Sequence, residues 1–367
     1  MRVVRVFSVV GVCVMAWGTS SLWAQNAPAQ TGGEVVAGKV FNPDISAIGN
    51  FVGVGGSNPV NPSPAMEMRE SEVSLQAVVD PYTRGDFFLA FGQEGVELEE
   101  GYITFPALPG GVLGRVGKMR AAFGKVNTLH THVLPWVDRP LVTQNLVGGD
   151  EGISDAGFSI APRFISVGGA FLEATAQVYR GDAGDVFRSS QPRDLAYVGH
   201  LRGYGDLSES TNVDVGFSVG HGHNDAGYIA DVDVGRFHTL LLGTDFSVKW
   251  RPLSRSIYRS FAARGEIVWS RRQQFDGPQQ ASGFFVSGEY QFARRWVLGG
   301  RYDDSATATD ASLRDKGGSA LVTYRPSEFS QLRGQYRRTN YGVGSVANEV
   351  LLQLQFLIGA HGAHPFY

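Results

Sequence analysis

The chain has 367 residues and a formal net charge of −3, with 48 glycines, 11% aromatic residues, only 18% charged residues and one cysteine. The many large apolar side chains exclude a disordered chain, the single Cys excludes a disulfide scaffold or Cys-rich zinc module, and the charge offers no basic surface for nucleic acid. No segment beyond the N-terminus approaches the roughly 18 apolar residues of a membrane-spanning helix. A transmembrane β-barrel fits, because alternating lipid-facing and lumen-facing residues average to a mean hydropathy near zero.

The N-terminus has the order of a secretory signal. Arg2 and Arg5 precede an apolar run over residues 6–17, and small and polar residues follow up to Ala24. This order predicts a signal peptide over residues 1–24. The alternative is a single N-terminal membrane anchor, for which the apolar run is too short.

Residues 25–40 are polar and contain Gly and Pro, which predicts a flexible lead-in. From residue 41 to the C-terminus at 367, apolar residues recur mostly with a period of two. The last segment places Val350, Leu352, Leu354, Phe356 and Ile358 on one face, and Glu349, Gln353 and Gln355 on the other. A strand produces this separation of faces, whereas a helix would spread the apolar residues around its circumference. Residues 41–367 are therefore expected to form an outer-membrane β-barrel.

The pattern predicts about 16 antiparallel strands, with 14 as the alternative because the first pair has the weakest alternation. They are placed at 43–56, 72–80, 85–93, 95–106, 112–124, 155–165, 169–180, 195–205, 211–223, 238–251, 256–272, 282–294, 296–304, 317–326, 330–341 and 347–359. Short turns alternate with long connections, as in outer-membrane barrels. The predicted fold is all-β, a transmembrane antiparallel β-barrel. A soluble β-sandwich or β-helix is the alternative, but no repeat period is present and aromatic residues gather near strand ends.

Two segments resemble known proteins. The stretch from Gly117 to Asn127, with a Gly-Lys core that runs into a Phe-Gly corner before a long loop, resembles the phosphate-selective-porin-like group and related porins. The end, from Phe356 to Tyr367, resembles bacterial outer-membrane proteins often labelled TonB-dependent or zinc-regulated receptors. The resemblance implies an outer-membrane barrel of porin type. A TonB-dependent receptor also has a plug domain and 22 strands, which this chain is too short to supply.

The string Gly216-Phe217-Ser218-Val219-Gly220 matches the G-x-S-x-G pattern of serine hydrolases. A nucleophile elbow needs a sharp strand-to-helix turn, whereas this string lies inside an alternating strand. No His or Asp context supports a hydrolase. Ser218 is therefore expected to be an ordinary residue facing the lumen, and no enzyme activity is predicted.

Two His-x-His pairs offer weak metal-site candidates. His130 and His132 lie in the long connection, and His221 and His223 close a strand. Such a pair on an extended segment places both rings on one side, where a nearby carboxylate could complete a Zn²⁺ site. The sequence shows no clear third ligand for either pair. Interfacial or loop histidines are therefore the preferred interpretation, and no metal or cofactor is assigned.

The connection 125–154 is long and contains Leu134, Trp136, Val137 and other apolar residues. A loop of this length needs a structural or functional reason. We expect it to fold into the barrel as a constriction, with Asp138 and Arg139 offering charges to the pore. A cap packed on the outer rim is the alternative.

The polar phase of the strands carries more basic than acidic residues, which indicates a hydrated interior. The basic set is Lys118, Arg120, Arg202, Lys249, Arg264, Arg272, Arg301, Arg325, Arg333 and Arg337, and the acidic set is Glu100, Glu173, Asp214, Asp245, Glu266, Glu289 and Asp303. The pore-lining candidates are Lys118, Arg120, Asp138, Arg139, Arg202, Arg264, Arg301, Arg333 and Arg337.

The predicted function is passive diffusion of small hydrophilic solutes or ions, with a weak anion preference set by Lys118 and Arg120 near the narrowest point. The expected partners are the lipid bilayer, lipopolysaccharide and the solutes themselves; a homotrimer is left open and nucleic acid is excluded. The alternatives are an outer-membrane receptor for a metal or metal chelate, suggested by the His pairs, and an outer-membrane enzyme, suggested by Ser218 alone.

Overall fold

The computed structural model describes residues 43–92, 95–162, 165–167, 169–230 and 232–359. The predictions for the signal peptide over 1–24 and the lead-in over 25–40 lie outside the described residues, as do residues 360–367. In this part of the chain, no helix has the length and hydropathy needed to cross a membrane.

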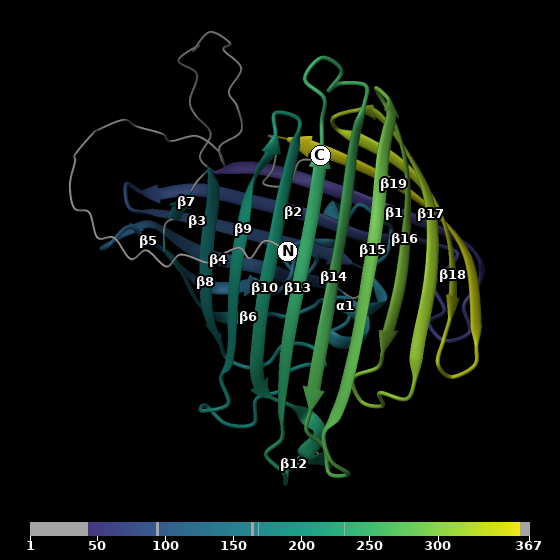
Figure 1. Cartoon of the computed structure of the whole chain (residues 1–367). Coiled ribbons are helices and arrows are strands. Elements are labelled where there is room, and N and C mark those ends of the chain that lie inside the picture. Colours follow the sequence, from purple (N-terminus) through teal and green to yellow (C-terminus); the bar gives the residue numbers. More distant parts are fainter. Residues whose placement is uncertain (1–42, 93–94, 163–164, 168, 231, 360–367) are drawn as a thin grey trace, which may run out of the picture. The chain divides into compact units, whose positions relative to one another are not determined.

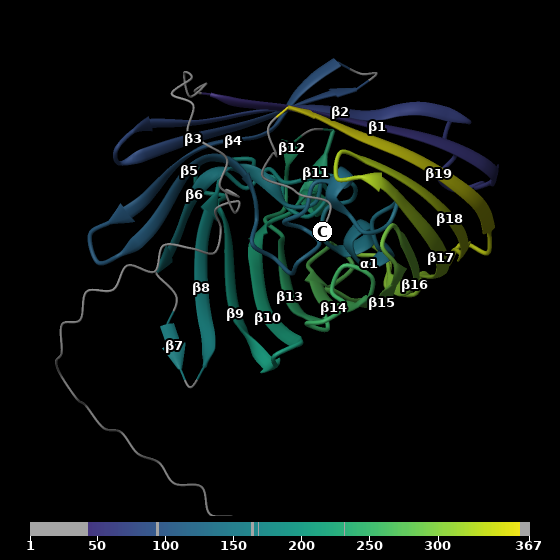
Figure 2. The same cartoon turned by 90° about the horizontal axis from the view of Figure 1, so that it is seen from above.

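The described residues form a closed antiparallel barrel with 16 strand positions in its wall (Figures 1 and 2). Its strands are β1 (Asp44–Ser57), β2 (Met66–Asp80), β3 (Thr83–Gly92), β4 (Gly95–Leu108), β5 (Val112–Arg120), β6 (Ser154–Pro162), β7 (Ile165–Val167), β8 (Ala170–Tyr179), β9 (Ala196–Ser208), β10 (Thr211–His223), β13 (His238–Trp250), β14 (Ser260–Arg272), β15 (Gln279–Ala293), β16 (Trp296–Ala306), β17 (Arg314–Ser327), β18 (Ser330–Asn340) and β19 (Val346–Gly359). Segments β6 and β7 both pair with β8 and share one position. The predicted barrel of 16 strands is confirmed.

The barrel closes where β1 pairs with β19, from Ser46 opposite Gly359 to Ser57 opposite Asn348. Strand β1 therefore begins at the same end of the barrel at which β19 ends, as an even number of strands requires. Outside the wall strands lie the helix α1 (Leu141–Leu146), the 3₁₀ turns η1 (Thr131–Val133) and η2 (Asp225–Gly227), and a hairpin of β11 (Tyr228–Ile229) and β12 (Val232–Asp233).

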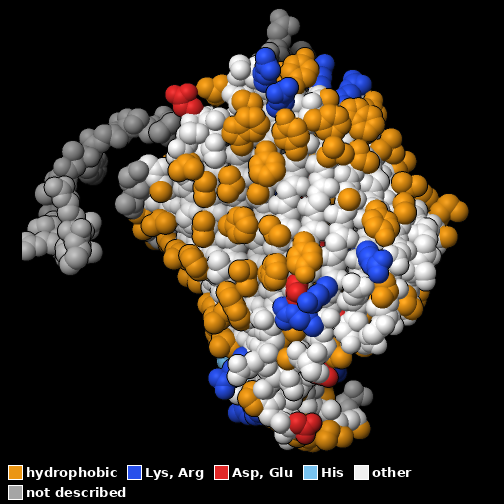
Figure 3. Space-filling view, turned by 45° about the vertical axis from the view of Figure 1, so that its right-hand side comes forward, with side chains coloured by type: hydrophobic (Ala, Val, Ile, Leu, Met, Phe, Trp, Pro, Cys, Tyr) orange, Lys and Arg blue, Asp and Glu red, His pale blue; other side chains and the backbone are white. Residues whose placement is uncertain are grey.

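The two faces of the wall differ as the alternation predicts. On β19, Leu354 is 41% exposed on the outer face, whereas its neighbour Gln353 is 2% exposed on the inner face. Strand β13 repeats this, with Phe246 outside and Asp245 inside. Hydrophobic side chains gather on the outer wall over much of its height (Figure 3). Only this outer face can lie against lipid without burying charge in hydrocarbon.

Short turns and long loops alternate along the chain, also as predicted. One difference is where β5 ends. The sequence predicts a strand over 112–124, but β5 leaves the wall after Arg120 and a loop runs over residues 121–153. We call residues 121–153 the inner loop. Its first residue, Ala121, donates its N–H to the carbonyl of Ile153, so the two ends of the loop meet at the wall.

The inner loop folds into the barrel, where α1 contacts β14, β15, β16 and β17 (Figure 2). Trp136 of the loop packs edge-on against the inward-facing Phe285, with ring centroids 5.2 Å apart. Phe123 and Leu146 join the same buried cluster with the inward-facing Leu241. The predicted polar interior is therefore incomplete: at the level of the loop the barrel has an apolar core, because loop and wall each supply apolar side chains.

Candidate functional site

The inner loop starts at a tight corner beside the wall. Gly124 has a φ of +60°, and a Cβ there would lie 2.8 Å from Oε2 of Glu266. Its N–H donates to Oγ of Ser218 over 2.9 Å, and the N–H groups of Lys125 and Val126 donate to Oε1 of Glu266 over 2.5 and 2.7 Å. Glycine is needed here because the left-handed backbone and the buried carboxylate leave no room for a side chain.

The middle of the loop is held by Asp138, which joins two of the predicted pore-lining arginines. Its Oδ2 accepts from Arg301 Nη2 over 2.7 Å and from Arg337 Nη1 over 2.9 Å, and Gln335 donates to Oδ1. Burial alone would raise the pKa of Asp138, but the charges of Arg301 and Arg337 hold it well below its usual range. Asp138, Arg301 and Arg337 therefore form one buried anchor and do not present separate charges to a pore.

Two further predicted pore-lining arginines support the loop backbone. Arg333 donates to the carbonyl of Leu134 over 3.0 Å, and Arg139 donates to the carbonyl of Leu129 over 2.9 Å. Both side chains are buried. Burial, with the nearby Arg120, lowers the pKa of Arg139 to about 10, so it still carries its charge at neutral pH.

Lys118 and Arg120 are not the accessible charges that the sequence predicts for the narrowest point of the pore. The Arg120 side chain is 3% exposed and paired with Glu99, so it does not face water. Lys118 is partly exposed but pairs over 3.1 Å with Glu97, whose side chain is the more exposed of the two. Sequence alternation placed Arg120 inward correctly, but it could not show that a neighbouring carboxylate covers it. A bulge in the β3–β4 pairing turns both Glu99 and Glu100 inward, against simple alternation.

Arg202 and Arg264 retain accessible charge. Arg202 of β9 pairs with Asp214 over 2.7 Å, and their side chains are 38% and 8% exposed. Arg264 of β14 pairs with Glu289, at 24% and 11% exposure. Lys125 of the inner loop also lies 2.9 Å from Asp214 and is 24% exposed. Arg202 also pairs with Glu173 over 3.1 Å, and that carboxylate is 37% exposed. On this part of the wall three cationic side chains are therefore accessible, against one accessible carboxylate among the described residues that bind them, Glu173.

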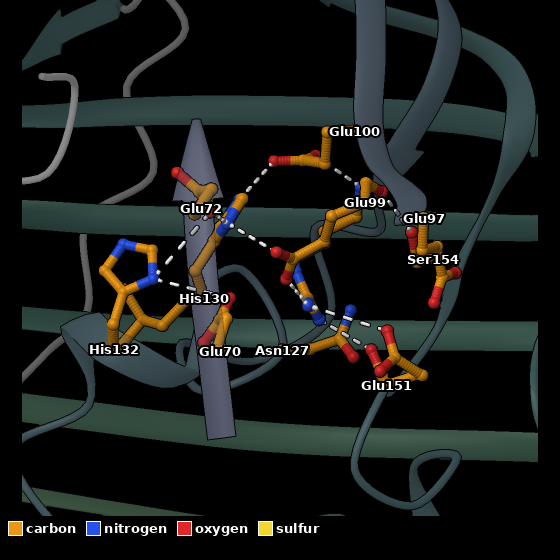
Figure 4. Close-up of polar contacts among 12 residues, drawn as sticks. Glu70, Glu72, Glu97, Glu99, Glu100, Asn127, His130, His132, Glu151 and Ser154 are labelled. Atoms are coloured by element: carbon orange, nitrogen blue, oxygen red, sulfur yellow. Dashed lines mark hydrogen bonds and ion pairs between the residues drawn. The ribbon is translucent and has the colours of Figure 1, made fainter. Parts of the chain in front are cut away.

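The first His pair lies at the junction of the inner loop with β2 and β4 (Figure 4). His130 Nδ1 lies 2.7 Å from Glu72 Oε2, and His130 Nε2 lies 2.7 Å from Glu100 Oε2. His132 Nδ1 lies 3.5 Å from Glu70 Oε1. Burial disfavours a charged imidazole, but the hydrogen bonds of Glu100, Glu72 and Glu99 raise the pKa of His130 well above its usual range. Sequence reasoning missed Glu70, Glu72 and Glu99, since Glu72 lies 58 residues from His130.

The second His pair lies near the end of β10. His223 Nδ1 donates to the carbonyl of Arg188 over 2.6 Å, and its Nε2 lies 3.1 Å from Asp233. The His221 ring stacks on His238 with centroids 5.3 Å apart. Among the described residues, the group here that could hold a metal contains one imidazole, with Asp194 and Asp233 as the other members.

Ser218 faces the interior of the barrel, as predicted, but its surroundings differ from the prediction. The sequence shows no histidine near it, but Nδ1 of His200 lies 2.8 Å from Ser218 Oγ. Ser218 nevertheless lies within strand β10, away from any strand-to-helix turn, and its hydroxyl accepts the N–H of Gly124. Its environment is that of a residue that fixes the start of the inner loop.

Comparison with known proteins shows the fold of this chain. No protein-family model matches it. An uncharacterized protein of Aquifex aeolicus (strain VF5) is 26% identical over 386 residues, covering 89% of this chain and 81% of that protein. Among solved structures, an anion-selective porin from Comamonas acidovorans superposes with a TM-score of 0.61 at 10% identity, covering 86% of this chain and 99% of the porin.

Two other solved structures agree with this fold. A loop L8 deletion mutant of OmpT, an outer membrane protein of Vibrio cholerae, gives a TM-score of 0.59 at 9% identity and covers 86% of this chain and 99% of its own. The outer membrane channel DcaP of Acinetobacter baumannii gives 0.54 at 11% identity, covering 86% of this chain and 96% of its own. The chain thus has the fold of outer-membrane porins. The narrower phosphate-selective group is not confirmed by these neighbours.

Proposed function

We propose that the protein is an outer-membrane channel for passive diffusion of small hydrophilic solutes or ions. The observation that carries this proposal is a closed 16-strand barrel with an apolar outer face, a charged inner face and a long loop folded inside. Neighbours described as porins and channels support a channel and give no support to a receptor or an enzyme. Export by the N-terminal signal, contact with lipopolysaccharide and assembly as a homotrimer belong to the same proposal; one OmpT neighbour is a trimer form.

A weak anion preference follows from the accessible charges on the wall from β9 to β14. Arg202, Arg264 and Lys125 are all accessible, whereas Asp214 and Glu289 are largely buried and Glu173 is the one accessible carboxylate in the described part of the chain that binds them, so a passing ion meets more cationic than anionic groups. Arg120 does not contribute, because Glu99 covers it. Charges are screened within about 8–10 Å at physiological salt, so the preference should be modest and should grow as salt is lowered.

Reversal potentials of the purified protein in planar bilayers, under a salt gradient, test both parts. The unmodified protein should conduct and favour chloride over potassium. Arg202→Gln combined with Arg264→Gln should reduce that preference, while Arg255→Gln, in the exposed turn between β13 and β14, should leave it unchanged. Absence of conductance would contradict the channel, and cation selectivity would contradict the assignment of Arg202 and Arg264.

A further inference from the structure

Four carboxylates are buried together where the inner loop meets the wall: Glu70 and Glu72 of β2, and Glu99 and Glu100 of β4. Among the described residues, the cations that interact with them are Arg120, paired with Glu99, and Arg139, which donates to backbone carbonyls. The group therefore carries one negative charge in excess when His130 is protonated, and two when both imidazoles are neutral, as metal ligands must be. Buried carboxylates without a compensating charge are strongly destabilising, so an additional cation would stabilise this group.

Two imidazoles complete the group, and ligand atoms converge between loop and wall (Figure 4). One ligand atom each from Glu72, His130 and His132 lies within 4.8 Å of the other two. Glu72 Oε2 lies 2.7 Å from His130 Nδ1 and 3.8 Å from His132 Nδ1. In a tetrahedral zinc site, bonds of about 2.0–2.2 Å separate the ligand atoms by roughly 3.3–3.6 Å. The two observed distances lie on either side of this spacing, so shifts of less than about 1 Å would bring the three atoms to the geometry of a metal site.

The surroundings of His130 match those of a metal-bound imidazole. Its Nε2 donates to Glu100, and Glu100 in turn accepts the backbone N–H of Arg120 over 2.6 Å. A ligating histidine usually donates its second ring N–H to a carboxylate, which leaves the other nitrogen free to bind the metal. Here that other nitrogen is Nδ1, and it faces Glu72.

A fourth ligand is available from Glu70. Its Oε2 has no hydrogen-bond partner among the described residues, although the side chain is nine-tenths buried. A carboxylate oxygen of Glu70 also lies within 4.8 Å of ligand atoms of Glu72 and Glu99. A buried polar atom of this kind needs a partner, and a cation between Glu70 and Glu72 would be one.

We propose that Glu70, Glu72, His130 and His132 bind a divalent transition metal of the Zn²⁺ type. Two imidazole nitrogens with carboxylates and no thiolate suit zinc, whereas Mg²⁺ and Ca²⁺ prefer oxygen ligands alone. The ion joins the inner loop, which supplies both histidines, to strand β2, which supplies both glutamates. It thereby fixes the loop inside the barrel. This site is separate from the accessible arginines on the wall from β9 to β14.

The group of Asp194, His223 and Asp233 differs from the proposed site in its ligands and in its charge. It offers one imidazole, and Asp194 is already compensated by Arg236 and by the hydroxyl and N–H of Ser190. With a neutral imidazole this second group therefore carries one negative charge in excess, on Asp233, which accepts from the Ser190 hydroxyl. His223→Gln is therefore a matched control for a change at His132.

The test is calorimetric titration of the metal-free, refolded protein with Zn²⁺, with bound metal measured separately after dialysis. The unmodified protein should bind one equivalent. Glu100→Gln should weaken binding by about 10- to 100-fold, the usual effect of losing the carboxylate that orients a ligating histidine. His132→Gln and Glu72→Gln remove ligands and should weaken it further, while His223→Gln should bind as the unmodified protein does.

No zinc binding by the unmodified protein, or equal binding in His132→Gln and Glu72→Gln, would overturn the proposal. Loss in His223→Gln alone would overturn it too, since the metal would then lie elsewhere. If the ligand variants do not refold, the visible spectrum of Co²⁺ bound to the unmodified protein decides. A four-coordinate spectrum with nitrogen ligands supports the site, and a six-coordinate spectrum contradicts it. Each readout is independent of conductance, so the channel proposal can fail or succeed separately.

Discussion

Asp138 shows at the scale of one residue how charge holds the inner loop in place. It is buried, and Arg301 and Arg337 both donate to it. Asp138→Asn should destabilise the barrel by about 3–5 kcal/mol, because removing one partner leaves buried charges without compensation. Urea unfolding measures this. Asp182→Asn, at the exposed pair with Arg180, is the control and should change stability by about 1 kcal/mol or less.

Asp138 also predicts the direction in which the stability of the protein changes with pH. Because the folded protein holds the pKa of Asp138 below its unfolded value, its stabilisation is complete above about pH 4 and is lost on further acidification. Asp138→Asn should lack this part of the acid dependence. An unchanged acid-unfolding profile, or a variant as stable as the Asp182→Asn control, would show that the Arg301 and Arg337 contacts contribute little.

At the scale of elements, two effects require glycine at position 124, where the inner loop begins: the left-handed backbone and the close contact with Glu266. Substitutions at two glycines of the loop separate these effects. Gly124→Ala should cost about 1–2 kcal/mol for the left-handed backbone and more for the contact with Glu266. Gly149, in the same loop, has a φ of +70° and nothing within 4 Å of an added Cβ, so Gly149→Ala carries the strain alone. Unfolding in urea compares them. Equal losses would mean that the Glu266 contact does not constrain the loop.

The strands were predictable and the loop contacts were not, for a physical reason. Alternation is local, so the predicted strands 211–223 and 238–251 agree with β10 (Thr211–His223) and β13 (His238–Trp250). The apolar residues of 125–154 also indicated that the loop folds inward. The partners of that loop depend on tertiary structure: Asp138 meets Arg337, and His130 meets Glu72, across long stretches of chain. No pattern within either segment specifies such a pair.

At the scale of the whole molecule, a membrane-spanning barrel requires that a charge introduced on the outer face of the wall destabilises the protein more than the same charge on the inner face. Ala174 and Thr175 are adjacent on β8 and therefore lie at nearly the same depth, with Ala174 exposed on the outer face and Thr175 turned inward beside His200 of β9. Ala174→Arg should cost about 2–4 kcal/mol if it lies near the midplane of a bilayer, because the guanidinium would enter hydrocarbon.

Thr175→Arg should cost much less, since its side chain points to the interior, where Glu173 of the same strand is partly exposed and can pair with it. Unfolding titrations of both variants in lipid vesicles give the comparison. The difference should disappear when the protein is unfolded from detergent micelles that let water reach the outer face, because the penalty belongs to the bilayer and not to the strand. Equal destabilisation of the two variants in vesicles would contradict a membrane-spanning barrel, whatever the purified protein conducts.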